Sequence, residues 1–158
     1  MEGQITKANK QDLQEIIYLQ RQAFQKIAIQ EDNFYITPLT QTLEDIEIEF
    51  ERRLFLKYTI NDKIVGSVRA HLQDNVCHIG RLVVLPEFQN KGIGKRLLQE
   101  IENLFANCEK FVLFTGLKHG ALGFYIKFGY TVTSMEEFNG IPIACLEKKN
   151  IKQLNVQS

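Results

Sequence analysis

Residues Cys77 to Phe105, with the sequence CHIGRLVVLPEFQNKGIGKRLLQEIENLF, organise the rest of this chain. The apolar first part predicts a buried strand, and the spacing of apolar residues in the last part predicts an amphipathic helix. A glycine-bearing loop, Gln89 to Gly94, joins the two. Such a loop binds anions, because unpaired backbone N–H groups and the positive end of the helix dipole face the same point. Lys91, Lys95 and Arg96 add cations, so the sequence predicts a phosphate-binding corner.

Two common phosphate-binding motifs do not fit this loop. A Walker A loop, Gly-x-x-x-x-Gly-Lys-Ser/Thr, requires a glycine and a hydroxyl residue where the chain has Gln89 and Arg96. A dinucleotide fingerprint requires a third glycine where the chain has Leu97. The acidic ribose ligand of that fingerprint, roughly 20 residues further on, would fall in the stretch 112–115, which contains no acid.

The pattern that fits is Gln-x-x-Gly-x-Gly on a strand-to-helix turn. Residues Leu82 to Gly94, LVVLPEFQNKGIG, resemble the acetyl-CoA pyrophosphate loop of the GNAT superfamily of N-acetyltransferases. A second block, Leu122 to Tyr130, LGFYIKFGY, resembles the Leu-Tyr-x-Lys-x-Gly-Phe/Tyr segment of that family, at the separation that the family uses. The resemblance covers most of the chain.

Composition sets the class of protein. The 158 residues suit one domain, and their 19 basic and 19 acidic residues cancel, so no nucleic-acid or membrane partner is indicated. No apolar run approaches the roughly 18 residues that span a bilayer, and residues 1–4 lack the features of a signal peptide. Cys77, Cys108 and Cys145 form no Cys-x-x-Cys pair. We therefore expect a cytoplasmic protein with reduced thiols and no metal site.

Hydrophobic periodicity and turn residues predict the order of the elements. Asn9 and Asp12 form a capping-box-like pair at the start of the first helix. The segment 43–53 alternates like a strand, but its charges and the family pattern favour a helix. The expected strands are 4–7, 54–60, 64–72, 76–85, 110–115, 130–138 and 141–147, and the expected helices are 10–29, 43–53, 93–105 and 121–128. The prediction is a mixed α/β fold whose central, mostly antiparallel sheet is flanked by helices, with one domain over 1–148 and a polar tail over 149–158.

The resemblance implies transfer of an acetyl group from acetyl-CoA to a primary amine of a small molecule or peptide, by direct attack. In the family, the strand before the loop diverges from its neighbour, so that its free amides meet the pantetheine arm. Glycines in the loop let a diphosphate approach the backbone. The residues implied to bind the cofactor are Leu82, Val83, Val84, Gln89, Asn90, Lys91, Gly92, Ile93, Gly94 and Lys95.

Two residues are candidates for proton transfer. Tyr125 matches the family tyrosine whose phenol protonates the departing thiolate; the alternative is core packing. His78 lies 14 positions before Gly92, where some members carry a glutamate base, and the alternative is a histidine that bonds to backbone. Strand alternation predicts that His78, Gly80, Leu82 and Val84 share one face, while His71 and His119 are weaker candidates. The family asparagine is absent, since its two usual positions hold Lys118 and Ala121.

The sequence alone does not identify the acceptor amine. In the family, the first helices, the loop between them and the last hairpin form its pocket, which here means about residues 22–50 and 133–143. Phe34 and Tyr35 line that pocket or pack in the core. The acids of 44–51 form a solvated face or attract a cationic amine. The competing function is a catalytically degenerate GNAT-like module that binds CoA or a ligand and regulates without turnover. The resemblance also implies that a homodimer is possible, since dimers through the last strands are common in the family.

Overall fold

The structure is a computed structural model that describes residues 3–31, 40–117, 120–138 and 140–151. It forms a seven-stranded sheet in the order β1-β2-β3-β4-β5-β7-β6, in which only β4 and β5 are parallel neighbours. The strands are β1 (Gln4–Lys7), β2 (Leu54–Ile60), β3 (Lys63–Gln73), β4 (Val76–Val84), β5 (Lys110–Gly116), β6 (Thr131–Phe138) and β7 (Ile141–Lys149). The helices are α1 (Leu13–Glu31), α3 (Leu43–Phe50), α4 (Ile93–Leu104) and α5 (Ala121–Lys127), with 3₁₀ turns η1 (Lys10–Asp12) and η2 (Pro86–Phe88). The predicted fold class is confirmed.

Local signals explain how the helices begin. Asn9 and Asp12 form the expected capping box, which starts η1 and leads into α1. A second capping box, Thr42 with Asp45, starts α3, so the favoured helix is correct and the strand alternative is wrong. The loop that we expect at 30–40, with Phe34 and Tyr35, lies mostly outside the described residues.

The two hairpins of the first half also follow local chemistry. Asn61 and Asp62 have φ values of 51° and 64°, and Asp74 and Asn75 have 53° and 65°. Two successive residues with positive φ form the tight turn that matches the twist of the flanking strands, and Asn and Asp tolerate that conformation. Both turns fall in the gaps between the expected strands 54–60, 64–72 and 76–85.

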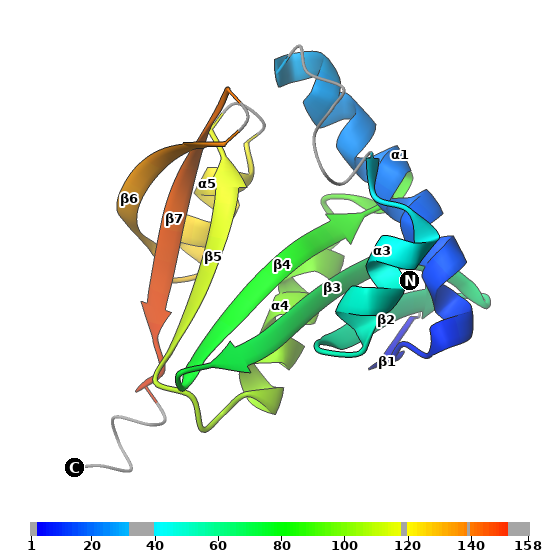
Figure 1. Cartoon of the computed structure of the whole chain (residues 1–158), viewed down its shortest axis with the longest axis horizontal. Coiled ribbons are helices and arrows are strands. Elements are labelled where there is room, and N and C mark those ends of the chain that lie inside the picture. The colour runs from blue at the N-terminus through cyan, green and yellow to red at the C-terminus, as the bar shows by residue number, and fades with distance from the viewer. Residues whose placement is uncertain (1–2, 32–39, 118–119, 139, 152–158) are drawn as a thin grey trace.

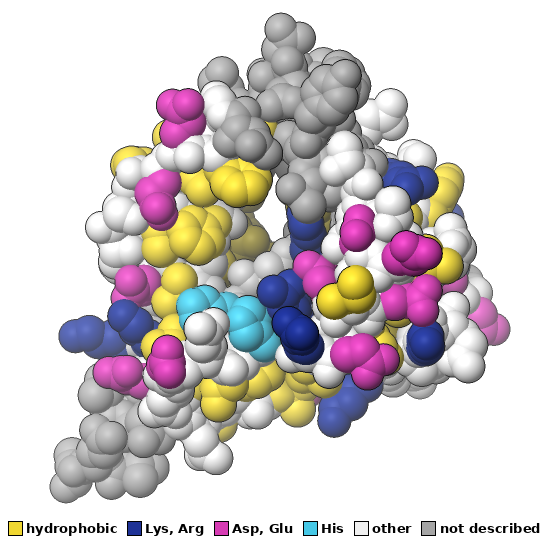
Figure 2. All heavy atoms as spheres, viewed as in Figure 1, with side chains coloured by type: hydrophobic (Ala, Val, Ile, Leu, Met, Phe, Trp, Pro, Cys, Tyr) yellow, Lys and Arg dark blue, Asp and Glu magenta, His cyan; other side chains and the backbone are white. Residues whose placement is uncertain are grey.

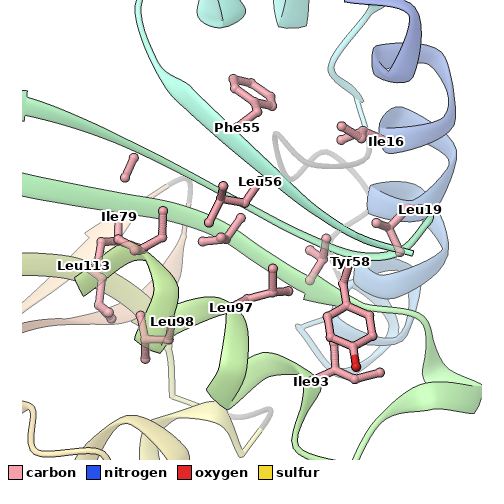
Figure 3. Close-up of a cluster of buried hydrophobic side chains, with 14 of the residues drawn as sticks. Ile16, Leu19, Phe55, Leu56, Tyr58, Ile79, Ile93, Leu97, Leu98 and Leu113 are labelled. Carbon is pink, nitrogen blue, oxygen red and sulfur yellow. The ribbon is translucent and has the colours of Figure 1, made fainter. Parts of the chain in front are cut away.

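Helices cover both faces of the sheet (Figure 1). On one face lie α1 and α3, where Glu49 of α3 bonds to Arg69 of β3. On the other lies α4, so close that a Cβ atom on Gly66 of β3 would meet Ile93 and Leu97 at 3.1 Å each. Figure 3 shows the aliphatic side chains of α4 inserted against the strands, as the sequence predicts. Leu104, the last residue of the helix, is 46% exposed.

The parallel pair β4–β5 opens part of the way along. It is paired only over Val76–His78 with Lys110–Val112. Beyond these residues the two strands diverge, while β5 continues against β7 up to Gly116. Figure 1 shows the two strands leaving a common end at an angle. The divergence that the resemblance implies is confirmed, and within the described part of the chain it leaves one backbone edge of β4 without a strand neighbour.

A β-bulge interrupts β4 at the start of this free edge. Ser67 of β3 pairs with Val83 of β4. Two residues further, Arg69 pairs with Gly80, so β4 holds one residue more than β3 between the two pairs. Arg81 is one of the two bulge residues of β4, and its φ is 53°.

The bulge overturns the expected strand alternation. His78 and Gly80 do share a face, since they pair with His71 and Arg69 of β3. An inserted residue reverses the alternation after it. Val84 therefore lies on the opposite face, near Gly94 of α4, and the expectation that it shares the face of His78 is wrong.

No helix in the described part of the chain is long and apolar enough to cross a membrane. The three cysteines are buried and free. The division into a domain over 1–148 and a tail over 149–158 remains a prediction.

Candidate active site

The divergence of β4 and β5 creates a cleft of about 600 Å³. Its walls come from β4, the glycine loop, the start of α4, β5, α5 and one turn of α1. Nine of the ten predicted cofactor residues line it: Leu82, Val83, Val84, Gln89, Asn90, Gly92, Ile93, Gly94 and Lys95. Tyr125 lines it as well. Figure 2 shows the hollow between the two halves of the molecule.

The glycine loop forms one end of the cleft. Gly92 precedes α4 with a φ of 83°, and no described side chain caps the helix. A Cβ atom on Gly92 would meet nothing within 4 Å, so the loop backbone faces open space. Asn90 also has a positive φ, 62°. The first N–H groups of α4 therefore stay available to an anion, with the helix dipole behind them.

Three polar residues of this corner have distinct contacts. The Gln89 side chain donates a hydrogen bond to the Val84 carbonyl at 3.0 Å, which ties the loop to the end of β4. Lys91 does not line the cleft, and its ammonium lies 5.7 Å from the centre of the Phe88 ring. Arg96 donates to the Tyr58 hydroxyl at 2.6 Å and so supports the core.

Tyr125 lines the cleft from α5. Its side chain is 8% exposed and its ring packs edge-on against Phe124 and Tyr130. Among the described residues its hydroxyl has no hydrogen-bond partner. Burial raises the pKa of this phenol, which keeps the proton on the oxygen at neutral pH. A buried phenol without a partner, facing a cleft, is free to donate to a bound molecule.

His78, the predicted base, is the last residue of β4 that pairs with β5. It does not line the cleft. Its ring stacks on His71 across the β3–β4 pair, with 5.1 Å between centroids. Burial lowers the pKa of His71, and the nearby Arg53 and His78 act in the same direction. His119 and Lys118 lie outside the described residues, and Ala121 lines the cleft where the family asparagine would stand.

A buried polar cluster beside the cleft escapes sequence reasoning. The carboxylate of Glu49 accepts hydrogen bonds from Arg69 and from Arg53. Arg69 is 3% exposed and also bonds to Gln20 of α1. Residues 20, 49 and 69 are far apart in the chain, so no local pattern signals the cluster. Arg81, the bulge residue, lines the cleft next to it.

The acids of 44–51 are therefore largely occupied by the protein itself. Glu49 bonds to two arginines, Asp45 accepts from the backbone of Thr42, and Glu47 lies 3.4 Å from Lys10. These contacts favour the structural reading of that charge run over attraction of an amine.

Comparison with known proteins agrees with this architecture. A family model described as an acetyltransferase (GNAT) domain matches residues 11–149, and the chain belongs to this family. It is thus an enzyme of the GNAT N-acetyltransferase class, as its two sequence blocks predict. Among curated proteins, the chain is 26% identical over 136 residues to the uncharacterized N-acetyltransferase YjcF of Bacillus subtilis. The aligned residues cover 85% of this chain and 90% of that protein.

Solved structures share the fold. The PaiA N-acetyltransferase of Thermoplasma acidophilum, solved in complex with coenzyme A, superposes with a TM-score of 0.81 at 23% identity, over 94% of this chain and 99% of that one. The ribosomal-protein-S18-alanine N-acetyltransferase of Escherichia coli superposes with a TM-score of 0.77 at 14% identity, over 94% of each chain. At these identities the likeness concerns the fold.

Proposed function

We propose that the protein transfers an acetyl group from acetyl-CoA to a primary amine of a small molecule or peptide, by direct attack. The observation that carries the proposal is Tyr125. Its buried hydroxyl has no partner among the described residues and lines the same cleft as the glycine loop. A module that only binds has no need of a phenol in that position, so the degenerate-module alternative is less favoured.

The residues present suit acetyl-CoA. The uncapped start of α4 and the open space beside Gly92 suit a diphosphate. Lys95 lines the cleft and adds a positive charge. The free edge of β4 over 82–84 suits an extended arm with amide groups, which adds as a strand would. A fold shared with a protein solved in complex with coenzyme A supports this assignment.

Acetyl-CoA supplies the acyl group as an activated thioester. The chain contributes orientation, through the loop and the edge of β4, and backbone N–H groups that stabilise negative charge on the acyl oxygen. Tyr125 holds a proton for the leaving sulfur, since its raised pKa keeps the phenol neutral. The amine must lose a proton before attack. His78 remains our candidate base and acts through water, because it does not line the cleft.

The first test is a calorimetric titration of the protein with acetyl-CoA, with NAD and ATP as controls. We expect selective binding of acetyl-CoA, followed by thiol release when an acceptor amine is added. Failure of the folded protein to bind acetyl-CoA would refute the assignment of the Gln89–Gly94 loop. Binding without thiol release for any amine would instead support the regulatory module.

A further inference from the structure

Arg81 belongs to the bulge of β4 and lines the cleft. Its φ of 53° is uncommon for a residue with a side chain, and a bulge is a device that turns one side chain away from the regular direction of its strand. The glycine loop follows the last residue of β4, Val84. Arg81 lies three residues before Val84, which is about 10 Å along the strand. Arg81 thus lies upstream of the phosphate corner along β4, in a cleft that Ala23 and Phe24 of α1 also line.

The charges around Arg81 do not balance. Arg53, Arg69 and Arg81 all interact electrostatically with the single carboxylate of Glu49. Glu49 is already hydrogen-bonded to the first two of these arginines. Within the described part of the chain, Arg81 itself forms no hydrogen bond or ion pair. Three guanidinium groups against one carboxylate leave an excess of positive charge at this end of the cleft.

The protein holds the Arg81 guanidinium partly out of water without giving it a hydrogen-bonding partner among the described residues. A guanidinium has five N–H donors in a planar fork that matches the two oxygens of a carboxylate. Removing such a group partly from water is unfavourable unless an anion meets it. Figure 2 shows basic side chains and the described histidines on the rim of the same opening.

We propose that Arg81 selects acceptor amines that carry a carboxylate, which it binds while the amine lies toward the acyl group. The inference rests on the proposed function and names the class of acceptor. Two sources supply this chemistry: free amino acids, and peptides whose first residue is Asp or Glu. A cationic polyamine is the wrong class, because the excess positive charge repels it.

The experiment compares matched acceptors with the full-length protein. One arm sets free amino acids against their carboxamides, and the other sets peptides beginning with Asp or Glu against peptides beginning with Asn or Gln. Thiol release gives KM and kcat for each. We expect a KM lower by roughly tenfold to a hundredfold for the carboxylate member of at least one arm, the range of a hydrogen bond to a charged group. The arm that shows the preference identifies the source.

Arg81→Gln tests whether this residue causes the preference. We expect it to raise KM for the carboxylate acceptor by the same factor, and to leave KM for the amide and the affinity for acetyl-CoA unchanged. Arg52→Gln is the matched control, because Arg52 is an exposed arginine that does not line the cleft. We expect this control to keep the preference.

Three outcomes would overturn the inference: equal KM values for acid and amide in both arms, an unchanged preference in Arg81→Gln, or a loss of acetyl-CoA affinity in that variant. Failure of the proposed function is a different result, since no amine would then release thiol. If no amine releases thiol, calorimetric titration with the carboxylate compounds tests the role of Arg81 separately from the proposed function. Binding that Arg81→Gln abolishes would uphold anion recognition by Arg81, and absent binding would overturn it.

Discussion

Replacing Tyr125 with phenylalanine separates chemistry from stability in this fold. The substitution removes one oxygen and keeps the ring, which packs against Phe124 and Tyr130. Among the described residues that oxygen has no hydrogen bond to lose. We therefore expect the melting temperature of Tyr125→Phe to equal or exceed that of the wild type.

Turnover should respond very differently. A positioned general acid contributes about 10²- to 10⁴-fold to a rate. We expect kcat of Tyr125→Phe to fall within that range, while acetyl-CoA affinity stays nearly unchanged because the loop and the edge of β4 are intact. The assay is steady-state thiol release with saturating amine, combined with calorimetric titration of acetyl-CoA and differential scanning calorimetry.

Tyr130→Phe is the matched control. Tyr130 is 1% exposed, and its hydroxyl donates to Glu102 at 2.9 Å. Losing a hydrogen bond to a charged group costs about 1.5–3 kcal/mol, which for a chain of this size lowers the melting temperature by roughly 3–12 °C. Its kcat, measured well below that temperature, should stay near the wild-type value. A wild-type kcat in Tyr125→Phe would remove Tyr125 as the proton donor, and equal losses of kcat in both variants would show that the effect comes from packing.

Three further predictions follow from individual contacts. Gly92→Glu should weaken acetyl-CoA binding more than a hundredfold, because repulsion between the new carboxylate and the diphosphate costs several kcal/mol. Gly140→Glu is the control, since Gly140 has a similar φ of 79° but lies outside the cleft, and this variant should bind acetyl-CoA normally. Equal losses of affinity in both variants would indicate backbone strain alone. Arg69→Met should lower the free energy of unfolding by up to about 3–5 kcal/mol, since it removes one of the two arginine partners of the partly buried Glu49 carboxylate. Lys10→Met on the exposed pair should have no measurable effect in urea unfolding. Burial raises the pKa of the Cys77 thiol, so the folded state keeps a proton that the unfolded chain loses above about pH 8.5. Stability should then decline as pH rises, by up to about 1.4 kcal/mol per pH unit from this group, and Cys77→Ala should flatten that decline between pH 7.5 and 10; an unchanged slope would contradict the assignment.

Much of the fold was predictable because its signals are local. The capping box at Asn9 and the two turns of Asn and Asp residues act within four residues of sequence. The glycine loop is local in the same way, since Gly92 needs its positive φ whatever surrounds it. The cleft residues followed from that loop and from the second block around Tyr125, although their roles remain predictions.

The other features of the site depend on what lies beside each residue in space. Nothing in the sequence around Arg81 signals a bulge, because a bulge is a mismatch between two paired strands. That mismatch overturned the expected face of Val84. The position of His78 away from the cleft wall likewise depends on where β5 leaves β4, directly after their last paired residues.

The sequence by itself determined the family, the order of the elements and the loop that offers backbone N–H groups to an anion, because each depends on short segments with a fixed chemistry. Only the tertiary structure decided how charge is distributed around Arg81 in the cleft. There Glu49 is neutralised by Arg69 and Arg53, while Arg81 stays without a partner among the described residues. Basic and acidic residues are equal in number over the whole chain. Electrostatic interactions weaken with distance and screening, so the local excess of positive charge depends on which side chains the fold brings together.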